Sequence, residues 1–345
     1  MVATFGRIGL AVPPRKTQKS LWDGYFAAAY AGSRVAPHAW AGSGVQTRHG
    51  VVDPTVEDVS SWSTAQRMQR YVAEALPLGK DAVASALDSA GVAASDVGFF
   101  AVVSCTGYAT PGLDILLARD LGMPTSTQRL MVGHMGCYAA IPALAMVSDA
   151  ASARGLTGVL LCVELVSLHA QPPTNDTEQI VSHALFSDAA AAVVCRPGPG
   201  LRLVDIAAST DTGHIEKMTW DVTDLGFRMG LSSQVPDVLA GQVGPLVDDL
   251  LGRNRLARGD VSGWAVHPGG PRILDVVGDR LGLASGDLDA ARDTLRDHGN
   301  CSSPTVLMVM DELARRRTPT GGDTILAMAF GPGLTLYAAL LRWEN

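Results

Sequence analysis

The chain has 345 residues, of which 47% are hydrophobic and 18% charged, and its formal net charge is −7 at pH 7. This length permits two domains or one large fused unit with an aliphatic core. The negative charge excludes a general attraction to nucleic acid or to an anionic membrane, so an anionic ligand would need a local basic site.

The first segment, MVATFGRIGLAVPPRKTQ, has an apolar stretch broken by Gly and Pro, and it predicts an opening β-strand rather than a signal peptide. No run reaches the roughly 18 to 20 apolar residues that span a bilayer. The five cysteines form no CxxC pair and no metal-ligand spacing. Their odd number and scattered positions favour a reducing, cytoplasmic setting over a disulfide framework.

The same order of predicted elements occurs twice along the chain. Four pairs of segments match at offsets of 160 to 166 residues: 95–103 with 259–267, 116–122 with 276–282, 135–155 with 298–317, and 158–167 with 324–333. Four matches in register indicate an internal duplication, because chance accounts for one such match but not for four.

In each half, short aliphatic runs alternate with helical patterns, which is typical of strands joined by crossover helices. Segments 184–194 and 334–342 are predicted to be buried closing strands. We expect two mixed, mostly parallel sheets around central helices, layered α-β-α-β-α. Residues 1–197 form the first predicted half and residues 198–345 the second, with PGPG at 197–200 at the join.

The duplication places Cys137 and Asn300 at equivalent positions, each after a Gly and before a helical pattern, while His267 ends a predicted strand. A cysteine at a helix N-terminus has a lowered thiol pKa, and a neighbouring His stabilises its thiolate further. Asn and His can both donate to a thioester oxygen and stabilise an enolate. These three residues therefore predict an active site for carbon–carbon bond formation on thioesters.

Each of these residues also has an ordinary structural interpretation. A free Cys is usually a small buried hydrophobe, which is our expectation for Cys162 and Cys195 in their apolar strands. His267 before Pro-Gly-Gly fits a turn, and Asn300 after Gly fits a turn residue with positive φ. The three together, at repeat-related positions, are more informative than any one of them.

Five segments around these residues resemble the type III polyketide synthases of the chalcone synthase superfamily: MGCYAA at Cys137, ALFSDAAAAVV at Phe186, WAVHPGGPRIL at His267, GNCSSPTVLMVMDEL at Asn300, and FGPGLTLYAALL near the C-terminus. The resemblance implies a duplicated thiolase-like fold, a Cys137 nucleophile that carries the acyl chain, and His267 and Asn300 as the groups that drive decarboxylation of malonyl-CoA. It also implies a homodimer that uses CoA thioesters directly, with no metal or other cofactor.

The same resemblance assigns two gate positions between the CoA tunnel and the cavity. Phe186 matches a family phenylalanine, whereas Met229 stands where the family has a second one. Since methionine is flexible, we expect a looser gate that suits medium or long aliphatic starters, although Met229 could equally be a gap-filler.

Other positions match the cavity and the dimer interface of the family. Cys105 and His169 match residues that set cavity volume, and Thr110 matches a residue that reaches across the dimer interface. The cavity-base scaffold GFGPG is matched by Gly331, Pro332 and Gly333, with Ala329 in place of the first Gly.

The region that binds CoA phosphates in plant relatives departs from their pattern, because residues 32–49 contain only Arg34 and Arg48 as cations. We expect Arg48 or Arg272, together with Gly270 of the HPGG segment, to contact CoA. Arg272 could instead lie on a solvated helix start, and an acyl-carrier protein could deliver the starter.

Two other functions remain open from the sequence. A ketoacyl-ACP synthase III-like enzyme shares the fold and the Cys-His-Asn set but would condense once. A non-catalytic homologue that binds acyl-CoA would explain the altered CoA region but not the intact triad. The starter, the number of extensions, the extender and the mode of ring closure, to a pyrone or to a resorcinol type, do not follow from single residues.

Overall fold

The computed structural model describes residues 2–317 and 319–345. Nine of its strands form one large sheet in the order β11-β12-β13-β8-β1-β7-β6-β4-β5, and two further pairs, β2-β3 and β9-β10, form small separate sheets. The large sheet has two parts joined by a single residue pair, Phe5 with Leu201. These two parts, which are joined only at their adjoining edges, correspond to the two predicted sheets.

The first part contains β1 (Ala3–Ala11), β7 (Asp188–Pro197), β6 (Thr157–Leu165), β4 (Val97–Val103) and β5 (Gln128–Val132). In it, β7 runs antiparallel to β1 and β6, while β4 pairs in parallel with β6 and β5. The second part contains β8 (Gly200–Thr210), β13 (Thr335–Glu344), β12 (Thr324–Gly331) and β11 (Gly263–Val266). Here β13 runs antiparallel to β8 and β12, and β11 is parallel to β12.

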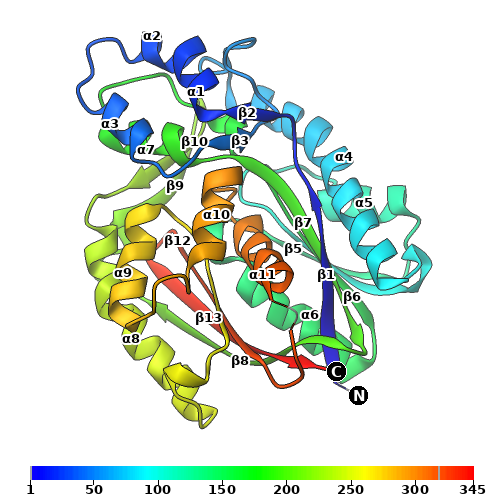
Figure 1. The fold of residues 1–345 in the computed structure, drawn as a ribbon. Coiled ribbons are helices and arrows are strands. Elements are labelled where there is room, and N and C mark those ends of the chain that lie inside the picture. The colour runs from blue at the N-terminus through cyan, green and yellow to red at the C-terminus, as the bar shows by residue number, and fades with distance from the viewer. Residues whose placement is uncertain (1, 318) are drawn as a thin grey trace.

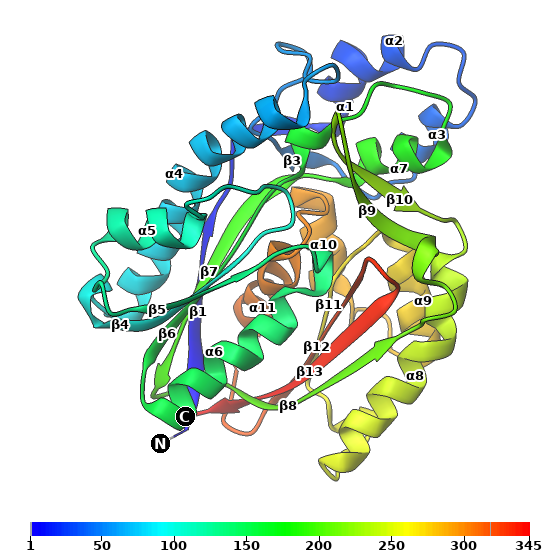
Figure 2. The same ribbon diagram turned by 180° about the vertical axis from the view of Figure 1, so that it is seen from behind.

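Helices form three layers around these two sheets. Between the sheets lie α6 (Ala140–Arg154) and α11 (Pro304–Arg316) (Figures 1 and 2). The outer face of the first sheet is covered by α4 (Thr64–Ala90) and α5 (Leu113–Leu121), and that of the second by α8 (Val235–Arg253) and α9 (Pro271–Leu281). The predicted α-β-α-β-α layering is confirmed, and the repeated elements follow one another in the same order in both halves. The sheets are mixed as expected but not mostly parallel, because β1, β7, β8 and β13 all pair antiparallel with their neighbours.

The helix α4 shows how local sequence fixes one of these layers. Ser63 and Gln66 form a capping box at its start, and Gly91 ends it in the left-handed conformation with φ of 59°. The helix packs so closely on β1 that a Cβ at Gly9 would lie 2.3 Å from the Ala82 carbonyl oxygen. Glycine at this position therefore permits the contact between strand and helix.

The remaining elements gather at one end of the sheets, at the top of Figure 1. They are β2 (Arg15–Thr17), α1 (Gln18–Leu21), the π-helical turn Trp22–Phe26, α2 (Ala27–Ala29), α3 (Ala36–Ala41), β3 (Thr47–His49), α7 (Thr177–Leu185), and the hairpin β9 (Met218–Thr223) and β10 (Gly226–Leu231). Beside them, α10 (Asp289–His298) leads into Asn300.

One predicted strand begins later than expected. The segment 184–194 contains the end of α7 and its C-cap Phe186, and β7 starts only at Asp188. The helical periodicity of residues 177–185 continues into this segment, and Phe186 instead forms an isolated parallel bridge with Asn300. Within the described part of the chain, no helix has both the length and the apolar character needed to cross a membrane.

Candidate active site

Cys137, His267 and Asn300 come from three different elements and line one cavity, together with Phe330, Phe186 and Met229. Cys137 lies in a 3₁₀ turn, Gly136–Tyr138, ahead of α6. His267 directly follows β11, and Asn300 lies four residues before α11. The structure therefore brings together the three residues that the sequence selects.

The turn that carries Cys137 is packed against the Gly331-Pro332-Gly333 segment. A Cβ at Gly331 would lie 2.9 Å from the Tyr138 ring and 3.2 Å from the Cys137 nitrogen. A Cβ at Gly136, where φ is 72°, would lie 2.5 Å from the Pro332 ring. These close approaches require small residues on both sides, so this segment fixes the position of the nucleophile turn.

Asn300 lines the cavity and is held by hydrogen bonds of its backbone and of its side-chain oxygen. Its backbone N–H donates to the Leu185 carbonyl, and its own carbonyl accepts from the Ser187 N–H, both at 2.9 Å. The Ser302 N–H donates to the Asn300 side-chain oxygen at 2.9 Å. Since the oxygen of the carboxamide is occupied, its NH₂ group remains for a ligand.

His267 is 1% exposed, and among the described residues neither of its ring nitrogens has a hydrogen-bond partner. Its backbone N–H donates to the Met328 carbonyl, which continues the ladder between β11 and β12. The Phe330 ring lies edge-on to the imidazole with centroids 6.2 Å apart. A buried imidazole without a partner is available for a ligand or for proton transfer.

Burial shifts the pKa values of Cys137 and His267 in the empty cavity. It raises the pKa of the Cys137 thiol to about 12 and lowers the pKa of His267 to about 3. The sequence predicts a lowered thiol pKa from a helix N-terminus, but Cys137 precedes α6 and is shielded from water. At neutral pH the empty cavity therefore holds a neutral thiol and a neutral imidazole, and an imidazole in this form can accept a proton.

A buried carboxyl group next to Cys137 was not selected from the sequence. Glu164 accepts from the Cys105 N–H at 2.9 Å, the Thr106 hydroxyl at 2.8 Å and the Ser303 hydroxyl at 2.6 Å. Burial raises the pKa of Glu164 to about 7. Nothing in the pattern of its strand distinguishes this residue, since its partners come from segments that only the fold brings together.

Ser302 connects the triad to the second cysteine at the site. Its hydroxyl lies 3.5 Å from the Cys137 sulfur and 3.7 Å from the Cys105 sulfur, and its φ of 58° is left-handed. Cys105 is buried, and burial raises the pKa of its thiol. Cys105 was predicted to line the cavity, but it lies behind the lining of the catalytic cavity, and the Ser302 hydroxyl contacts both its sulfur and that of Cys137.

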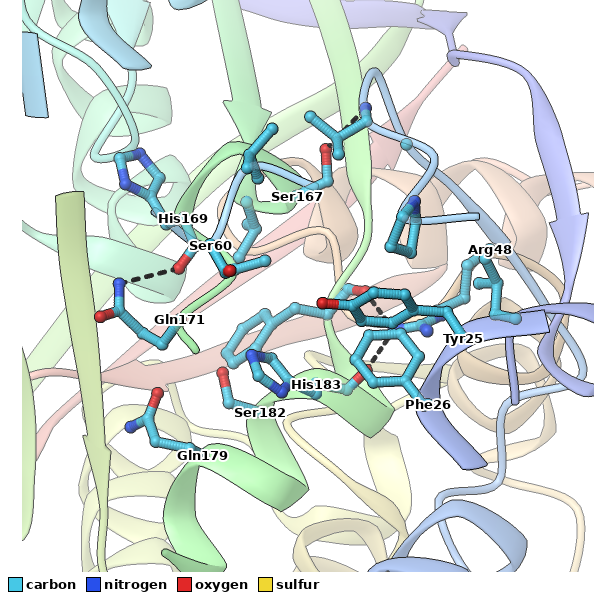
Figure 3. Close-up of a pocket in the computed structure, with 18 of the residues that line it drawn as sticks. Tyr25, Phe26, Arg48, Ser60, Ser167, His169, Gln171, Gln179, Ser182 and His183 are labelled. Atoms are coloured by element: carbon cyan, nitrogen blue, oxygen red, sulfur yellow. Dashed lines mark hydrogen bonds between the residues drawn. The ribbon is translucent and has the colours of Figure 1, made fainter. Parts of the chain in front are cut away.

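Phe186 and Met229 line both the catalytic cavity and a second cavity, which we call the inner chamber (Figure 3). The inner chamber is also lined by His169, Trp220 and Phe227. Phe186 and Met229 therefore lie between the two cavities, as the gate hypothesis requires of their positions.

His169 is held rigidly in the wall of the inner chamber. Its Nε2 bonds the Thr106 carbonyl at 2.6 Å, its Nδ1 accepts from the Phe227 N–H at 2.9 Å, and its ring stacks on Phe227 at 4.5 Å. Trp220 lies edge-on to His169 and donates from its indole N–H to the Cys105 carbonyl at 2.7 Å. Trp220 thus forms part of the wall of the inner chamber, a role that its sequence context does not predict.

The position of Arg48 contradicts its predicted contact with CoA phosphates. The guanidinium is buried, donates to the carbonyls of His183 at 2.5 Å and Phe186 at 3.0 Å, and lies 4.9 Å from the Trp40 ring centroid. Burial lowers the pKa of Arg48 to about 10. Its cationic group is thus engaged with the backbone beside the gate, and the side chain lines the inner wall of a cavity rather than an exposed surface.

Arg272 lies at the mouth of the catalytic cavity, exposed and paired with Asp237 at 2.8 Å. Gly270 lines the same cavity in an extended conformation that any residue adopts, at the N-cap of α9. Thr110 is exposed and lines neither cavity. Gly333, in the segment packed against the Cys137 turn, donates its N–H to the Met218 carbonyl at 2.8 Å.

Comparison with known proteins places this fold and site in one class. The N-terminal domain of chalcone and stilbene synthases matches residues 48–199, and their C-terminal domain matches residues 209–343. A 1,3,6,8-tetrahydroxynaphthalene synthase of Streptomyces peucetius is 35% identical over 87% of this chain and 81% of that protein. A 3,5-dihydroxyphenylacetyl-CoA synthase of Amycolatopsis balhimycina is 34% identical over 78% of this chain and 74% of that protein.

The solved structures agree with these matches. The 1,3,6,8-tetrahydroxynaphthalene synthase of Streptomyces coelicolor, described as a bacterial type III polyketide synthase, superposes with a TM-score of 0.93 at 27% identity over 99% of both chains. The fold and the matched domains thus define an acyltransferase of the thiolase-like class. The chain belongs to the chalcone and stilbene synthase family, and it is a type III polyketide synthase.

Proposed function

We propose that this enzyme condenses an acyl-CoA starter with malonyl-CoA extenders and cyclises the product, with Cys137, His267 and Asn300 as its catalytic residues. The convergence of these three side chains on one cavity carries the proposal. Similarity to a tetrahydroxynaphthalene synthase and to the α-pyrone-forming Pks18 of Mycobacterium tuberculosis, which is 30% identical over 88% of this chain, supports a pyrone or resorcinol-type product.

The first step is transfer of the starter to Cys137. His267 takes the thiol proton as the sulfur attacks the thioester carbonyl, and that proton leaves with the CoA thiol. The imidazole suits this role because it is buried and lacks a protein partner.

The second step forms the enolate nucleophile. Malonyl-CoA loses CO₂, and the electron pair of the broken bond moves onto the thioester, whose oxygen accepts from the Asn300 NH₂ and the His267 N–H. The enolate carbon then attacks the Cys137 thioester. A carbon–carbon bond forms, the sulfur leaves, and the chain is two carbons longer on CoA. The side chains and the thioesters supply all of this chemistry without a metal or a separate cofactor.

CoA would lie along the outer part of the catalytic cavity. Arg272 is the cation at that mouth, and it can exchange its exposed Asp237 partner for a phosphate at small cost because surface ion pairs contribute little. Gly270 would border the pantetheine arm. An acyl-carrier protein that delivers the starter is the alternative route.

We also propose that the chain acts as a homodimer through the free edge strand β5. Tyr108 is 67% exposed, and Ile115 and Met131 are also exposed around this edge, close in sequence to Thr110. An unpaired edge with apolar side chains favours pairing with a second copy. Sedimentation should give a dimer, and a monomer at micromolar concentration would contradict it.

The division of the chain into halves at 197/198 is a further part of the proposal. It is supported by the turn between β7 and β8. It is also supported by the boundary between the two matched domains, because the first match ends at residue 199 and the second begins at residue 209.

Incubation with labelled malonyl-CoA and a panel of acyl-CoA starters tests the proposed function. We expect labelled, chain-extended products that are cyclised. The absence of extended product with every starter, bound to CoA or to a carrier protein, would overturn the proposal.

A further inference from the structure

The inward face of α7 is polar where a buried helix face is usually apolar. Gln179, Ser182, His183 and Phe186 recur at the spacing i, i+3, i+4, i+7, which places them on one side of the helix. All four line the inner chamber. Ile180 and Ala184, on another side of the same helix, pack with Phe26 and Tyr30 in an apolar cluster.

The glutamines of the chamber present acceptors to its interior. The Gln179 amide nitrogen donates to the Met229 carbonyl at 2.6 Å. The Gln171 amide nitrogen donates to the carbonyls of His169 at 3.1 Å and Leu225 at 3.0 Å. With their NH₂ groups fixed in this way, both side chains offer their carbonyl oxygens.

Further polar groups surround the same space. Figure 3 shows Gln179, Ser182 and His183 reaching from α7 towards Tyr25 and Ser60. Tyr25 hydrogen-bonds to Asp58, which also holds Ser60. His183 bonds Tyr30 at 2.6 Å through Nδ1, whereas its buried Nε2 has no partner among the described residues.

An alkyl chain in this chamber would remove water from these groups without replacing its hydrogen bonds. Leaving one buried polar group unpaired costs more free energy than burying one CH₂ group gains. A chain built from two-carbon ketide units carries a carbonyl or enol hydroxyl on every second carbon. Such a chain can both accept and donate hydrogen bonds, as the polar groups on the α7 wall require.

We propose that the α7 face makes this enzyme selective for an oxygenated chain, with a short starter and repeated extension, and that Gln179 and Ser182 are its specificity residues. The inference rests on the proposed function and names its substrate class. It replaces the expectation of aliphatic starters drawn from Met229, because the flexible gate opens onto a chamber with a polar wall on the α7 side.

The test measures kcat/KM with acetyl-CoA, butyryl-CoA, octanoyl-CoA and dodecanoyl-CoA as starters, with labelled malonyl-CoA as extender. For the unmodified enzyme we expect the short starters to exceed the long ones at least tenfold. Ser182→Ala and Gln179→Leu should each shift this ratio towards the long starters severalfold, and together about tenfold or more.

Two controls separate specificity from loss of structure. The Ser182 side chain makes no hydrogen bond to another of the described residues, so Ser182→Ala stays informative even if Gln179→Leu, which releases the Met229 carbonyl, fails to fold. Gln46→Leu makes the same chemical change at an exposed side chain outside both cavities, and should leave the ratio unchanged.

A preference for dodecanoyl-CoA in the unmodified enzyme would overturn the inference while leaving the proposed function intact. An unchanged ratio in folded Ser182→Ala and Gln179→Leu would do the same. If no starter gave any extended product, the proposed function itself would fail.

Discussion

Cys137, the proposed nucleophile, lies in an environment that opposes its charged form. Burial raises the pKa of its thiol to about 12, so at neutral pH the reactive thiolate depends on a nearby base. His267 is the unpartnered imidazole in the same cavity. We therefore propose that the reactivity of Cys137 depends on His267 rather than on the position of Cys137 near a helix end.

We expect His267→Ala to slow alkylation of Cys137 by iodoacetamide at least tenfold at pH 7 to 8, since the variant has no acceptor for the thiol proton. Rates are followed by peptide mass spectrometry, with the buried Cys195 as the internal reference. An identical rate profile in the variant would show that His267 does not activate the thiol.

Gly331 tests the contact that holds the nucleophile turn. In Gly331→Ala the new methyl group would lie 2.9 Å from the Tyr138 ring and 3.2 Å from the Cys137 nitrogen, so the turn must move. A displacement of this kind costs about tenfold to a hundredfold in kcat. Gly241→Ala is the matched control, because Gly241 lies in α8 with no atom within 4 Å of the added Cβ. Full activity of Gly331→Ala would remove the positioning role.

At the scale of elements, a pair of histidines joins β3 to the segment that carries Asn300. His49 Nδ1 bonds the Pro13 carbonyl at 2.9 Å, so it carries a proton, and the neutral ring accepts at Nε2 from His298 Nδ1 at 3.2 Å. Burial lowers the pKa of His49, and it lowers the pKa of His298 to about 4. Protonation of His49 at Nε2 would place two N–H groups against each other.

Stability should therefore fall on acidification. The pKa of each of these histidines lies below its unfolded value, so the unfolded chain takes up protons first as the pH falls from about 6.5 towards 4. His169 and His183, each with a pKa lowered to about 4, add to this effect. Burial raises the pKa of Glu164 to about 7, so protonation of this group in the folded protein partly offsets the loss of stability on acidification.

Each proton bound only by the unfolded chain lowers the free energy of unfolding by about 1.4 kcal/mol per pH unit. Urea unfolding at pH 7.0, 6.0 and 5.0 measures the slope. We expect a decrease across this range, smaller in His298→Phe than in the unmodified protein. A stability that is constant or rises between pH 6 and pH 5 would contradict the account.

At the scale of the whole molecule, the sequence contains most of the architecture because the duplication repeats it. The equivalent strands β4 and β11, and the equivalent helices α6 and α11, each lie within the segments that match along the chain. The start of β7 was predicted too early, since the period of α7 runs into the apolar run after it. Strand periodicity cannot separate a helix end from a following buried strand.

Site residues could be predicted where they stand in a distinctive sequence segment. They could not be predicted where their role depends on contacts that only the fold creates. Cys137, His267 and Asn300 stand in distinctive segments. The burial of Arg48 and the contacts of Glu164 depend on segments far apart in sequence. The polar face of α7 is a different case, because its i, i+3, i+4, i+7 spacing is visible in the sequence once the helix is placed.

The central claim is that Cys137 holds the chain while His267 and Asn300 generate the enolate, and Cys137→Ala tests it most directly. With malonyl-CoA labelled at the carboxyl carbon, the variant should still release labelled CO₂ slowly and should form no chain-extended product. Cys195→Ala, in a buried strand away from the cavity, should extend chains at the normal specific activity. Extended product from Cys137→Ala at the level of the unmodified enzyme would contradict the account.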